Sequence, residues 1–280
     1  AGFTEHWRSA KGHYSARGVT AGDLTHDGHV DVFVSNYRLQ PNHLWRSDGA
    51  GKFENVAATV GAAGKPKGVI NYTGGVRYGI SGHTIGSAIG DLDNDGHLDI
   101  FVGNFSHPPK SQDRPEFLRN LGSKGGFKFE DKAAGAGLAW QESFASPTLG
   151  DFDNDGDLDL FVANYVLFEL STHPWCGRRD MDLRFYCDPR QYEPTTDLLY
   201  RNDDGRFVDI SERAGITKAG NGLGVVAGDF DGDGDADAFV SRGSLVGMLD
   251  EVGRSVDRWV ERGDDEQAVH SRDSLRDELL

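Results

Sequence analysis

The chain has 280 residues, 38 of them glycine, and a formal net charge of −16 from 29 basic and 45 acidic side chains. This acidity argues against a nucleic-acid partner, because proteins that bind phosphate backbones carry an excess of Lys and Arg. Glycine occurs at about twice its usual share of roughly 7%, which predicts a turn-rich, all-β chain rather than long helices. The sequence has no run of about 18 apolar residues, so it predicts no membrane insertion.

A nine-residue pattern, D-x-[DNT]-x-D-G-x-x-D, occurs four times, in repeats that start near residues 22, 90, 150 and 228. Oxygen donors at positions 1, 3, 5 and 9 and the backbone carbonyl at position 7 can surround one ion, and Gly at position 6 permits a sharp turn. Several carboxylates, with no nitrogen or sulfur side-chain ligands, select Ca²⁺ over zinc or copper. The sequence therefore predicts three to four Ca²⁺ ions as cofactors.

The predicted calcium ligands follow the same order in each repeat, and we call the four segments loops 1 to 4. In loop 1 they are Asp23, Thr25, Asp27, the carbonyl of His29 and Asp31; in loop 2 they are Asp91, Asp93, Asp95, the carbonyl of His97 and Asp99. In loop 3 they are Asp151, Asp153, Asp155, the carbonyl of Asp157 and Asp159; in loop 4 they are Asp229, Asp231, Asp233, the carbonyl of Asp235 and Asp237. Because Thr25 replaces a carboxylate, loop 1 is predicted to bind calcium most weakly.

The four loops are not EF-hands, which need a bidentate Glu at position 12 and flanking helices. Position 12 is Val in all four repeats and lies in an apolar, strand-like run. Each loop therefore lies between two predicted strands. In the first three repeats a β-hairpin follows, at 42–57, 117–133 and 198–211, where two short apolar runs flank a Gly-containing turn.

Each repeat of about 60 residues thus predicts four antiparallel strands, which is typical of a β-propeller blade. Residues 1–242 are predicted to form this β-propeller of about four blades. Four separate tandem domains are the weaker alternative, because one four-stranded sheet could hardly bury its own faces. Residues 2–5 resemble a fourth strand, so either they complete the last blade and close the ring, or a partner or another copy completes the open edges.

An insertion at residues 166–197 separates the second strand of the third repeat from its hairpin and contains both cysteines. Cys176 and Cys187 predict a disulfide that stabilises by about 2–4 kcal/mol; the alternative is two free thiols. The aromatic residues of the insertion favour a recognition surface, and the alternative is a loop that packs back onto the propeller.

Residues 243–280 are predicted to form a separate C-terminal unit. Apolar residues at helical spacing from Leu245 to Val260 predict an amphipathic helix of about 15 residues, and a charged tail follows it. The helix is predicted either to dock on the propeller or to mediate self-association.

The pattern G-D-x-D-x-D-G-x-x-D-x-F-V, followed by hairpins such as Leu-Tyr-Arg-Asn at 199–202, resembles the FG-GAP (VCBS) repeats of integrin α-type propellers. Within that superfamily, residues 1 to about 242 are most similar to secreted proteins of the cartilage acidic protein (ASPIC/UnbV) type. The resemblance implies calcium-stabilised blades and a secreted, periplasmic or cell-surface location. It also implies a role in adhesion, recognition or assembly, with a protein or a glycan as partner.

The sequence predicts a binding protein rather than an enzyme. It contains no G-x-S-x-G elbow, P-loop, dinucleotide fingerprint or H-E-x-x-H. Carboxylates saturated by Ca²⁺ are also unsuitable as general bases. The alternative to an adhesion or assembly module is a carbohydrate-binding, lectin-like propeller with ligands in pockets between blades.

Overall fold

The computed structural model describes residues 14–37, 40–64, 70–71, 77–78, 83–105, 114–138, 144–168, 172–185, 187–242 and 256–257. Strands dominate these residues, which contain one short helix, α1 (Ala57–Val60), and the 3-10 turns η1 (Ser123–Gly125), η2 (Arg179–Met181) and η3 (Pro189–Gln191). None of the helices in these ranges is long and apolar enough to cross a membrane. The predicted all-β class is confirmed.

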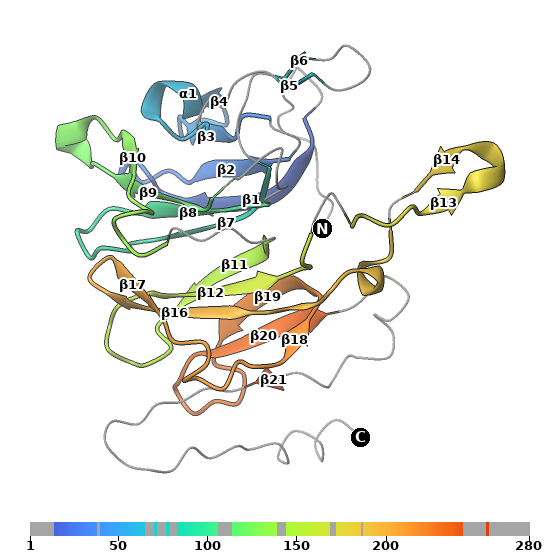
Figure 1. The fold of residues 1–280 in the computed structure, drawn as a ribbon. Coiled ribbons are helices and arrows are strands. Elements are labelled where there is room, and N and C mark those ends of the chain that lie inside the picture. Colours follow the sequence, from blue (N-terminus) through green and yellow to red (C-terminus); the bar gives the residue numbers. More distant parts are fainter. Residues whose placement is uncertain are drawn as a thin grey trace, which may run out of the picture.

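Four antiparallel sheets, which we call blades 1 to 4, are stacked in chain order (Figure 1). Blade 1 contains β1 (Ala16–Gly22), β2 (Asp31–Asn36), β3 (His43–Ser47) and β4 (Phe53–Asn55), and blade 2 contains β7 (Thr84–Gly90), β8 (Asp99–Asn104), β9 (Glu116–Asn120) and β10 (Phe129–Asp131). Blade 3 contains β11 (Phe144–Gly150), β12 (Asp159–Asn164), β16 (Leu198–Asp203) and β17 (Arg206–Asp209), and blade 4 contains β19 (Gly222–Gly228), β20 (Asp237–Arg242) and β21 (Val256–Asp257).

Three short two-stranded pairs lie outside the blades. They are β5 (Ile70–Asn71) with β6 (Arg77–Tyr78), β13 (Gly177–Arg178) with β14 (Leu183–Arg184), and β15 (Thr195–Thr196) with β18 (Ala219–Gly220). The four-stranded repeat unit predicted from the sequence is therefore present in full in blades 1 to 3.

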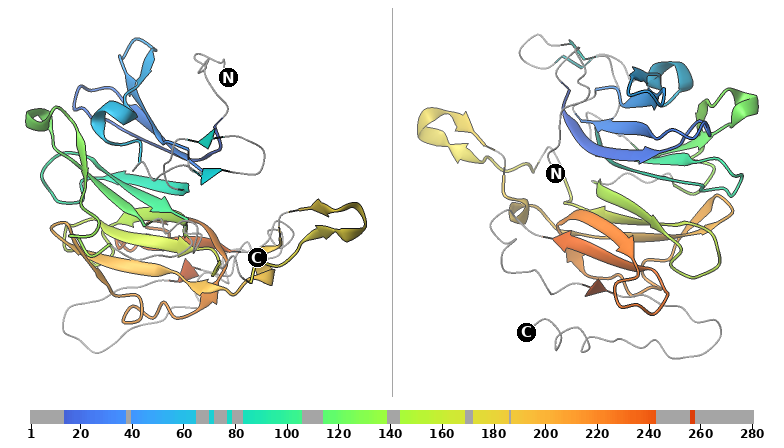
Figure 2. Two further views of the ribbon diagram at one scale, coloured as in Figure 1. Left: turned by 45° about the horizontal axis from the view of Figure 1, so that its top comes forward. Right: turned by 180° about the vertical axis from the view of Figure 1, so that it is seen from behind.

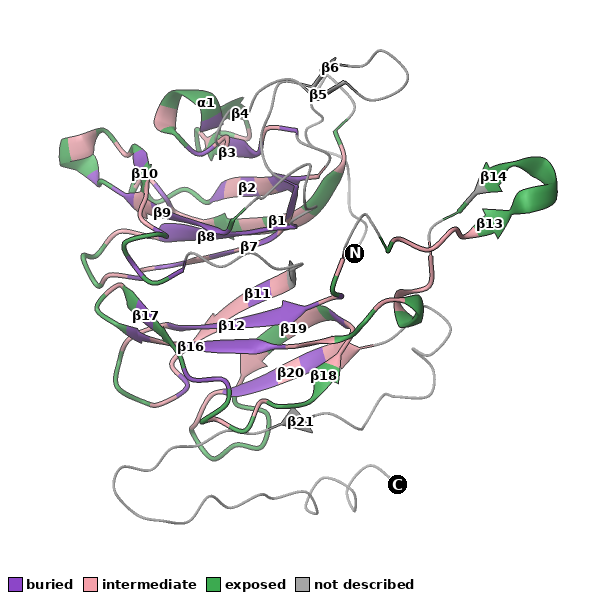
Figure 3. Cartoon of the chain, in the orientation of Figure 1, coloured by how far each residue is buried: buried purple, intermediate pink, exposed green. Residues whose placement is uncertain are grey.

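The hydrophobic core lies between the blades, because successive side chains of a strand point to opposite faces and both faces of an inner blade are covered. Every residue of β8 and of β12 is buried (Figure 3). One Phe in the second strand of each of blades 1 to 3 shares a core cluster with two apolar residues of the next blade. The groups are Phe33 with Ile100 and Val102, Phe101 with Leu160 and Val162, and Phe161 with Ala238 and Val240.

The innermost strands of the blades contact one another in the order β1, β7, β11, β19. Among the described residues, no contact of similar extent joins β19 back to β1. Figure 2 shows blades 1 and 4 at opposite ends of the stack. The predicted four-stranded sheets are thus present in blades 1 to 3, and blade 4 has three described strands. Of the two predicted alternatives, a closed ring and an open one, the described residues show no closed ring. The strand expected at residues 2–5 lies outside the described residues.

The predicted C-terminal helix also falls almost entirely outside the described residues. Val256 and Asp257 are described, and they form β21, which pairs with Phe239 and Ala238 of β20. At these two residues the helix prediction is wrong. The edge of β20 offers backbone hydrogen-bonding groups, and an extended dipeptide satisfies them.

A buried amide clamps each of blades 2 and 3 to the blade before it. Nδ2 of Asn202 donates to the carbonyl of Leu158 in its own blade (3.0 Å) and to that of Leu92 in blade 2 (2.9 Å). Asn120 does the same with Leu98 (3.1 Å) and with Leu24 of blade 1 (2.9 Å). All four carbonyls belong to loops 1 to 3, so the amides hold neighbouring loops together.

We predict that Asn202→Ala lowers the free energy of unfolding by about 2–3 kcal/mol, because it removes the partners of two buried carbonyls and of the Gly205 N–H. Urea unfolding at fixed calcium concentration measures the change. Asp203→Ala is the matched control on the same strand, since it removes only an exposed ion pair with Arg201, worth up to about 1 kcal/mol. Equal effects of the two substitutions would contradict the clamp.

Candidate metal centre

Each of loops 1 to 4 joins the first and second strands of its blade in one tight turn. In loop 2, Gly90 pairs with Asp99, so the loop begins and ends at neighbouring points of the sheet. Oδ1 of Asp91 accepts from the N–H of Asp95 (3.1 Å), and Oδ2 accepts from the N–H of Gly96 (2.9 Å). Gly96 has φ +87°, a left-handed conformation that explains the requirement for Gly at position 6.

The structure brings the carboxylates of positions 1, 3 and 9 together in three of the four loops. Their ligand atoms lie within 4.8 Å of one another, in the groups Asp91, Asp93, Asp99; Asp151, Asp153, Asp159; and Asp229, Asp231, Asp237. Loop 1 offers only Asp23 and Asp31 at the same positions, because Thr25 stands at position 3. The prediction that loop 1 is the weakest site remains a prediction, and this donor set agrees with it.

The position 5 carboxylates are not members of these groups. Oδ1 of Asp95 accepts from the N–H of His97 (3.0 Å), and Asp27, Asp155 and Asp233 make the same bond to the residue two positions on. Position 5 therefore shapes the turn around position 7, whose carbonyl is the predicted ligand.

The position 9 carboxylate ties each loop to the third strand of its blade. Asp99 is fully buried, and its two oxygens accept from the backbone N–H groups of Asn120 (2.7 Å) and Leu92 (3.0 Å). Burial raises the pKa of Asp99 to about 7, although these two N–H groups lower it. The equivalent Asp159 accepts from Asn202 (2.8 Å) and Phe152 (2.9 Å), and burial raises its pKa to about 7 as well.

The position 3 carboxylates provide the test of whether a cation fits. Oδ1 of Asp93 and Oδ1 of Asp153 are buried and accept no hydrogen bond from the described residues. Burial raises the pKa of both carboxyl groups, and neighbouring aspartates add to the rise. Buried oxygens normally have a partner, and a hard divalent cation among three carboxylates supplies one. The residues present therefore fit Ca²⁺.

Two arginines beside the loops were not predicted as part of the site. The guanidinium of Arg119 forms ion pairs with Asp93 and Asp95, the second at 2.9 Å. Arg201 takes the same position in blade 3 and pairs with Asp203 at 3.0 Å. The signal was in the sequence: an Arg stands at the same place in all three hairpins, as Arg46, Arg119 and Arg201.

The four loops form a continuous row, because position 4 of each loop contacts position 7 of the next. The contacts are His26 with His97 (ring centroids 5.1 Å apart), Nδ2 of Asn94 with Oδ1 of Asp157 (2.6 Å), and Nδ2 of Asn154 with Oδ1 of Asp235 (2.8 Å). The predicted sites are thus joined through side chains and not only through the core.

We predict that calcium binding weakens about tenfold between pH 8 and pH 6, because a proton on Asp99 or Asp159 competes with the ion. These pKa values lie above the ordinary 3.8, so without metal the two groups stabilise the fold at acidic pH. That contribution is lost as the pH rises through 7. Calorimetric titration with Ca²⁺ at both pH values measures the effect, and equal affinities would contradict it.

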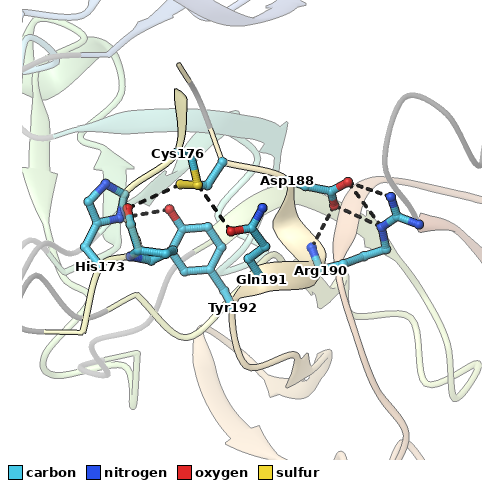
Figure 4. The surroundings of a disulfide bond; sticks show 8 residues. His173, Cys176, Asp188, Arg190, Gln191 and Tyr192 are labelled. Carbon is cyan, nitrogen blue, oxygen red and sulfur yellow. Dashed lines mark hydrogen bonds and ion pairs between the residues drawn. A yellow bond between two sulfur atoms is a disulfide. The ribbon is translucent and has the colours of Figure 1, made fainter. Parts of the chain in front are cut away.

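The insertion projects from the stack as a disulfide-linked arm, residues 172–185 and 187–192 (Figures 1 and 4). Cys176 and Cys187 are bonded, with Cα atoms 5.2 Å apart, so the predicted disulfide is confirmed. The bond encloses the β13–β14 hairpin, whose Met181, Leu183 and Phe185 are exposed (Figure 3). At the base of the arm, the Tyr192 hydroxyl lies 2.9 Å from Nδ1 of His173 (Figure 4).

Comparison with known proteins gives a family model and several relatives. The model of the FG-GAP-like repeat matches residues 23–102, 91–162 and 186–240. Cartilage acidic protein 1 is 25% identical over 238 residues in Mus musculus, 27% over 238 in Xenopus tropicalis and 25% over 230 in Homo sapiens. These alignments cover 82–83% of this chain and 28–29% of the relatives, so the chain spans less than a third of their length.

Among solved structures, a rhamnogalacturonan lyase PL11 of Bacillus licheniformis is similar, with a TM-score of 0.39 and 15% identity. The similarity covers 82% of this chain and 41% of the lyase chain. It is too low to carry a conclusion about fold or activity.

Proposed function

We propose that this chain, which belongs to the FG-GAP-like repeat family, is an extracellular recognition module whose blades are stabilised by Ca²⁺. The observation that carries the proposal is the buried, unpaired Oδ1 of Asp93 and of Asp153, each within a group of three carboxylates. A bound Ca²⁺ ion would neutralise the carboxylates and complete the coordination of these oxygens.

The chain's own residues explain why such an ion would be structural. Asp91 fixes the turn of its loop through two N–H groups, and Asp99 joins the loop to Asn120 at the end of β9. An ion held by these two residues and Asp93 would link the first, second and third strands of the blade. We propose binding rather than catalysis, because carboxylates committed to such an ion do not serve as general bases.

An extracellular location is supported by two observations. A disulfide between Cys176 and Cys187 persists in oxidising compartments and is rare in the cytosol. The relatives carry a name that places them in cartilage. We therefore propose a secreted or cell-surface protein whose partner is a matrix or cell-surface protein.

The arm is the surface we propose for that partner. Its hairpin exposes Met181, Leu183 and Phe185, and the Arg179 guanidinium lies over the ring of Trp175, 4.9 Å from the centroid. The cavity beside Leu24 and Phe129, between blades 1 and 2, has a volume of about 50 Å³; it is far smaller than ligand pockets of roughly 300 Å³ or more and so does not support the lectin-like alternative.

Counting bound calcium tests the proposal. Native mass spectrometry should find three to four Ca²⁺ ions per chain, and Asp153→Asn should remove one, because it replaces an anionic ligand in loop 3. Asp203→Asn is the control outside the loop. A chain that binds no calcium would contradict the metal role. Arrays of matrix proteins and of glycans, probed with the chain and with Phe185→Ser, would then separate the protein partner from the glycan.

A further inference from the structure

The two ends of the stack expose side chains whose equivalents are buried or partly buried inside it. Position 2 of the calcium loop is buried in blades 1 to 3, where Leu24, Leu92 and Phe152 face the next blade; Phe230, at the same position in blade 4, is 47% exposed. At position 8, Leu98 and Leu158 pack against the preceding blade, whereas Val30 of blade 1 is 57% exposed. Within the described residues, no blade follows blade 4 and none precedes blade 1.

Strand register extends this correspondence across the outer face of blade 1. Ala21 lies opposite Val32, and Val32 lies opposite Trp45. The equivalent row in blade 2 is Ile89, Ile100 and Leu118, and all three pack in the core between blades 1 and 2. The outer face of blade 1 therefore carries an apolar row at the positions that, in blade 2, receive the preceding blade.

The innermost strands place two exposed valines at matching contact positions. Thr20 of blade 1 contacts Ser87 of blade 2, with its Oγ1 2.8 Å from the Ser87 hydroxyl. By register, Val226 of blade 4 is the equivalent of Thr20, and Val19 of blade 1 is the equivalent of Ser87. Val226 is 50% exposed and Val19 is 68% exposed. The positions that form the polar Thr20–Ser87 contact between blades 1 and 2 are thus occupied by two exposed valines at the two ends of the stack.

From this register we propose that the outer face of blade 4 docks on the outer face of blade 1 of a second copy, so that the stack continues head to tail. The contact would bury Val226 and Phe230 against Val19, Val30 and Val32 of the other copy, in the arrangement that blades 1 to 4 already use. Because the two faces differ, the contact is heterologous, and it closes into a ring or extends into an open assembly.

Comparison of equivalent positions also indicates that the contact between copies would be weaker than the contacts between blades of one chain. Asn120 and Asn202 clamp blades 2 and 3 to their predecessors, but blade 1 has Ser47 at this position. An interface between copies would therefore lack the amide clamp. The charge of −16 on each chain also opposes association, and four Ca²⁺ ions would reduce it to about −8. We expect a reversible assembly that calcium and salt strengthen.

Sedimentation velocity of the full chain with excess Ca²⁺, from 1 to 100 µM, tests the proposal. The expected result is a mass of twice the monomer or more, which increases with concentration. Val19→Glu and Val226→Glu each place a charge on an exposed position of one face, so the fold is kept, and each should abolish the assembly. Phe185→Glu on the arm is the matched control and should leave it intact.

Mixing the two end variants is the decisive step, because each retains the face that the other lacks. Head-to-tail docking predicts that the mixture forms a heterodimer, in which blade 4 of the Val19→Glu chain contacts blade 1 of the Val226→Glu chain. A chain that stays monomeric at 100 µM, an assembly that survives both substitutions, or a mixture without heterodimer would overturn the proposal. Calcium stoichiometry is measured on the same samples, so failure of docking is distinguishable from failure of the metal role.

Discussion

We expect removal of calcium to lower the melting temperature of the chain by about 15 °C or more. A site held at 100 times its dissociation constant adds about 2.7 kcal/mol when the unfolded chain does not bind, so three sites add about 8 kcal/mol. For a chain of this size each kcal/mol shifts the melting temperature by roughly 2–4 °C. The effect is large because the carboxylates of loops 2 to 4 repel one another at close range when no cation lies among them.

Circular dichroism melts with excess Ca²⁺ and with a chelator measure this shift. Two controls isolate its cause. Mg²⁺ at the same concentration should restore little stability, because it demands octahedral geometry and retains its waters. Sodium chloride at matched ionic strength accounts for screening of the acidic surface. A melting temperature that is the same with Ca²⁺ and with chelator would mean that the loops act as turns alone.

The blades could be predicted from the sequence because each step was local. The strands that flank each loop, and the hairpins that follow in blades 1 to 3, needed only short apolar runs, glycines and the repeat itself, and the structure has strands at these places. Local signals also failed at two residues, because apolar residues at helical spacing predicted a helix where Val256 and Asp257 extend along β20; the rest of that helix prediction lies outside the described residues. At these two residues, backbone pairing with the edge of β20 outweighs the helical spacing of the apolar side chains.

The contacts between strands and between blades could not be predicted from the sequence. Asp99 was predicted as a calcium ligand, but its bond to the N–H of Asn120 depends on how β9 aligns with β8. The bond from Asn94 to Asp157 depends on how one blade stacks on the next. Spacing within a loop identifies which residues have oxygens that can bind calcium. Which of these oxygens already accept hydrogen bonds depends on the third strand and on the neighbouring blade.

The second large effect concerns a carboxylate whose oxygens are already used by the backbone. We expect Asp159→Ala to destabilise the chain even when calcium is absent. Asp159 is fully buried, and its loss leaves the backbone N–H groups of Asn202 and Phe152 without an acceptor. Each orphaned buried donor costs about 1–3 kcal/mol, so we expect a loss of about 2–6 kcal/mol in chelator at pH 6, where Asp159 is mostly protonated and its removal relieves little charge repulsion. Calcium should increase the loss further, because the variant also lacks one of the three clustered carboxylates of loop 3.

Asp155→Ala in the same loop is the matched control. Asp155 is exposed, and among the described residues its side chain accepts from the N–H of Asp157 alone (2.9 Å). In chelator this substitution should cost no more than about 1 kcal/mol. A larger cost in calcium would show that the position 5 carboxylate is a calcium ligand in addition to its role in the turn.

Urea unfolding of both variants, with and without calcium, therefore separates two roles that the pattern D-x-[DNT]-x-D-G-x-x-D combines. A carboxylate that joins strands destabilises the chain in both conditions when it is removed, whereas a carboxylate that only binds the ion does so in calcium alone. If Asp159→Ala and Asp155→Ala were equally mild in chelator, the bonds from Asp159 to Asn202 and Phe152 would contribute little. The loops would then be metal sites attached to blades that are stable without them.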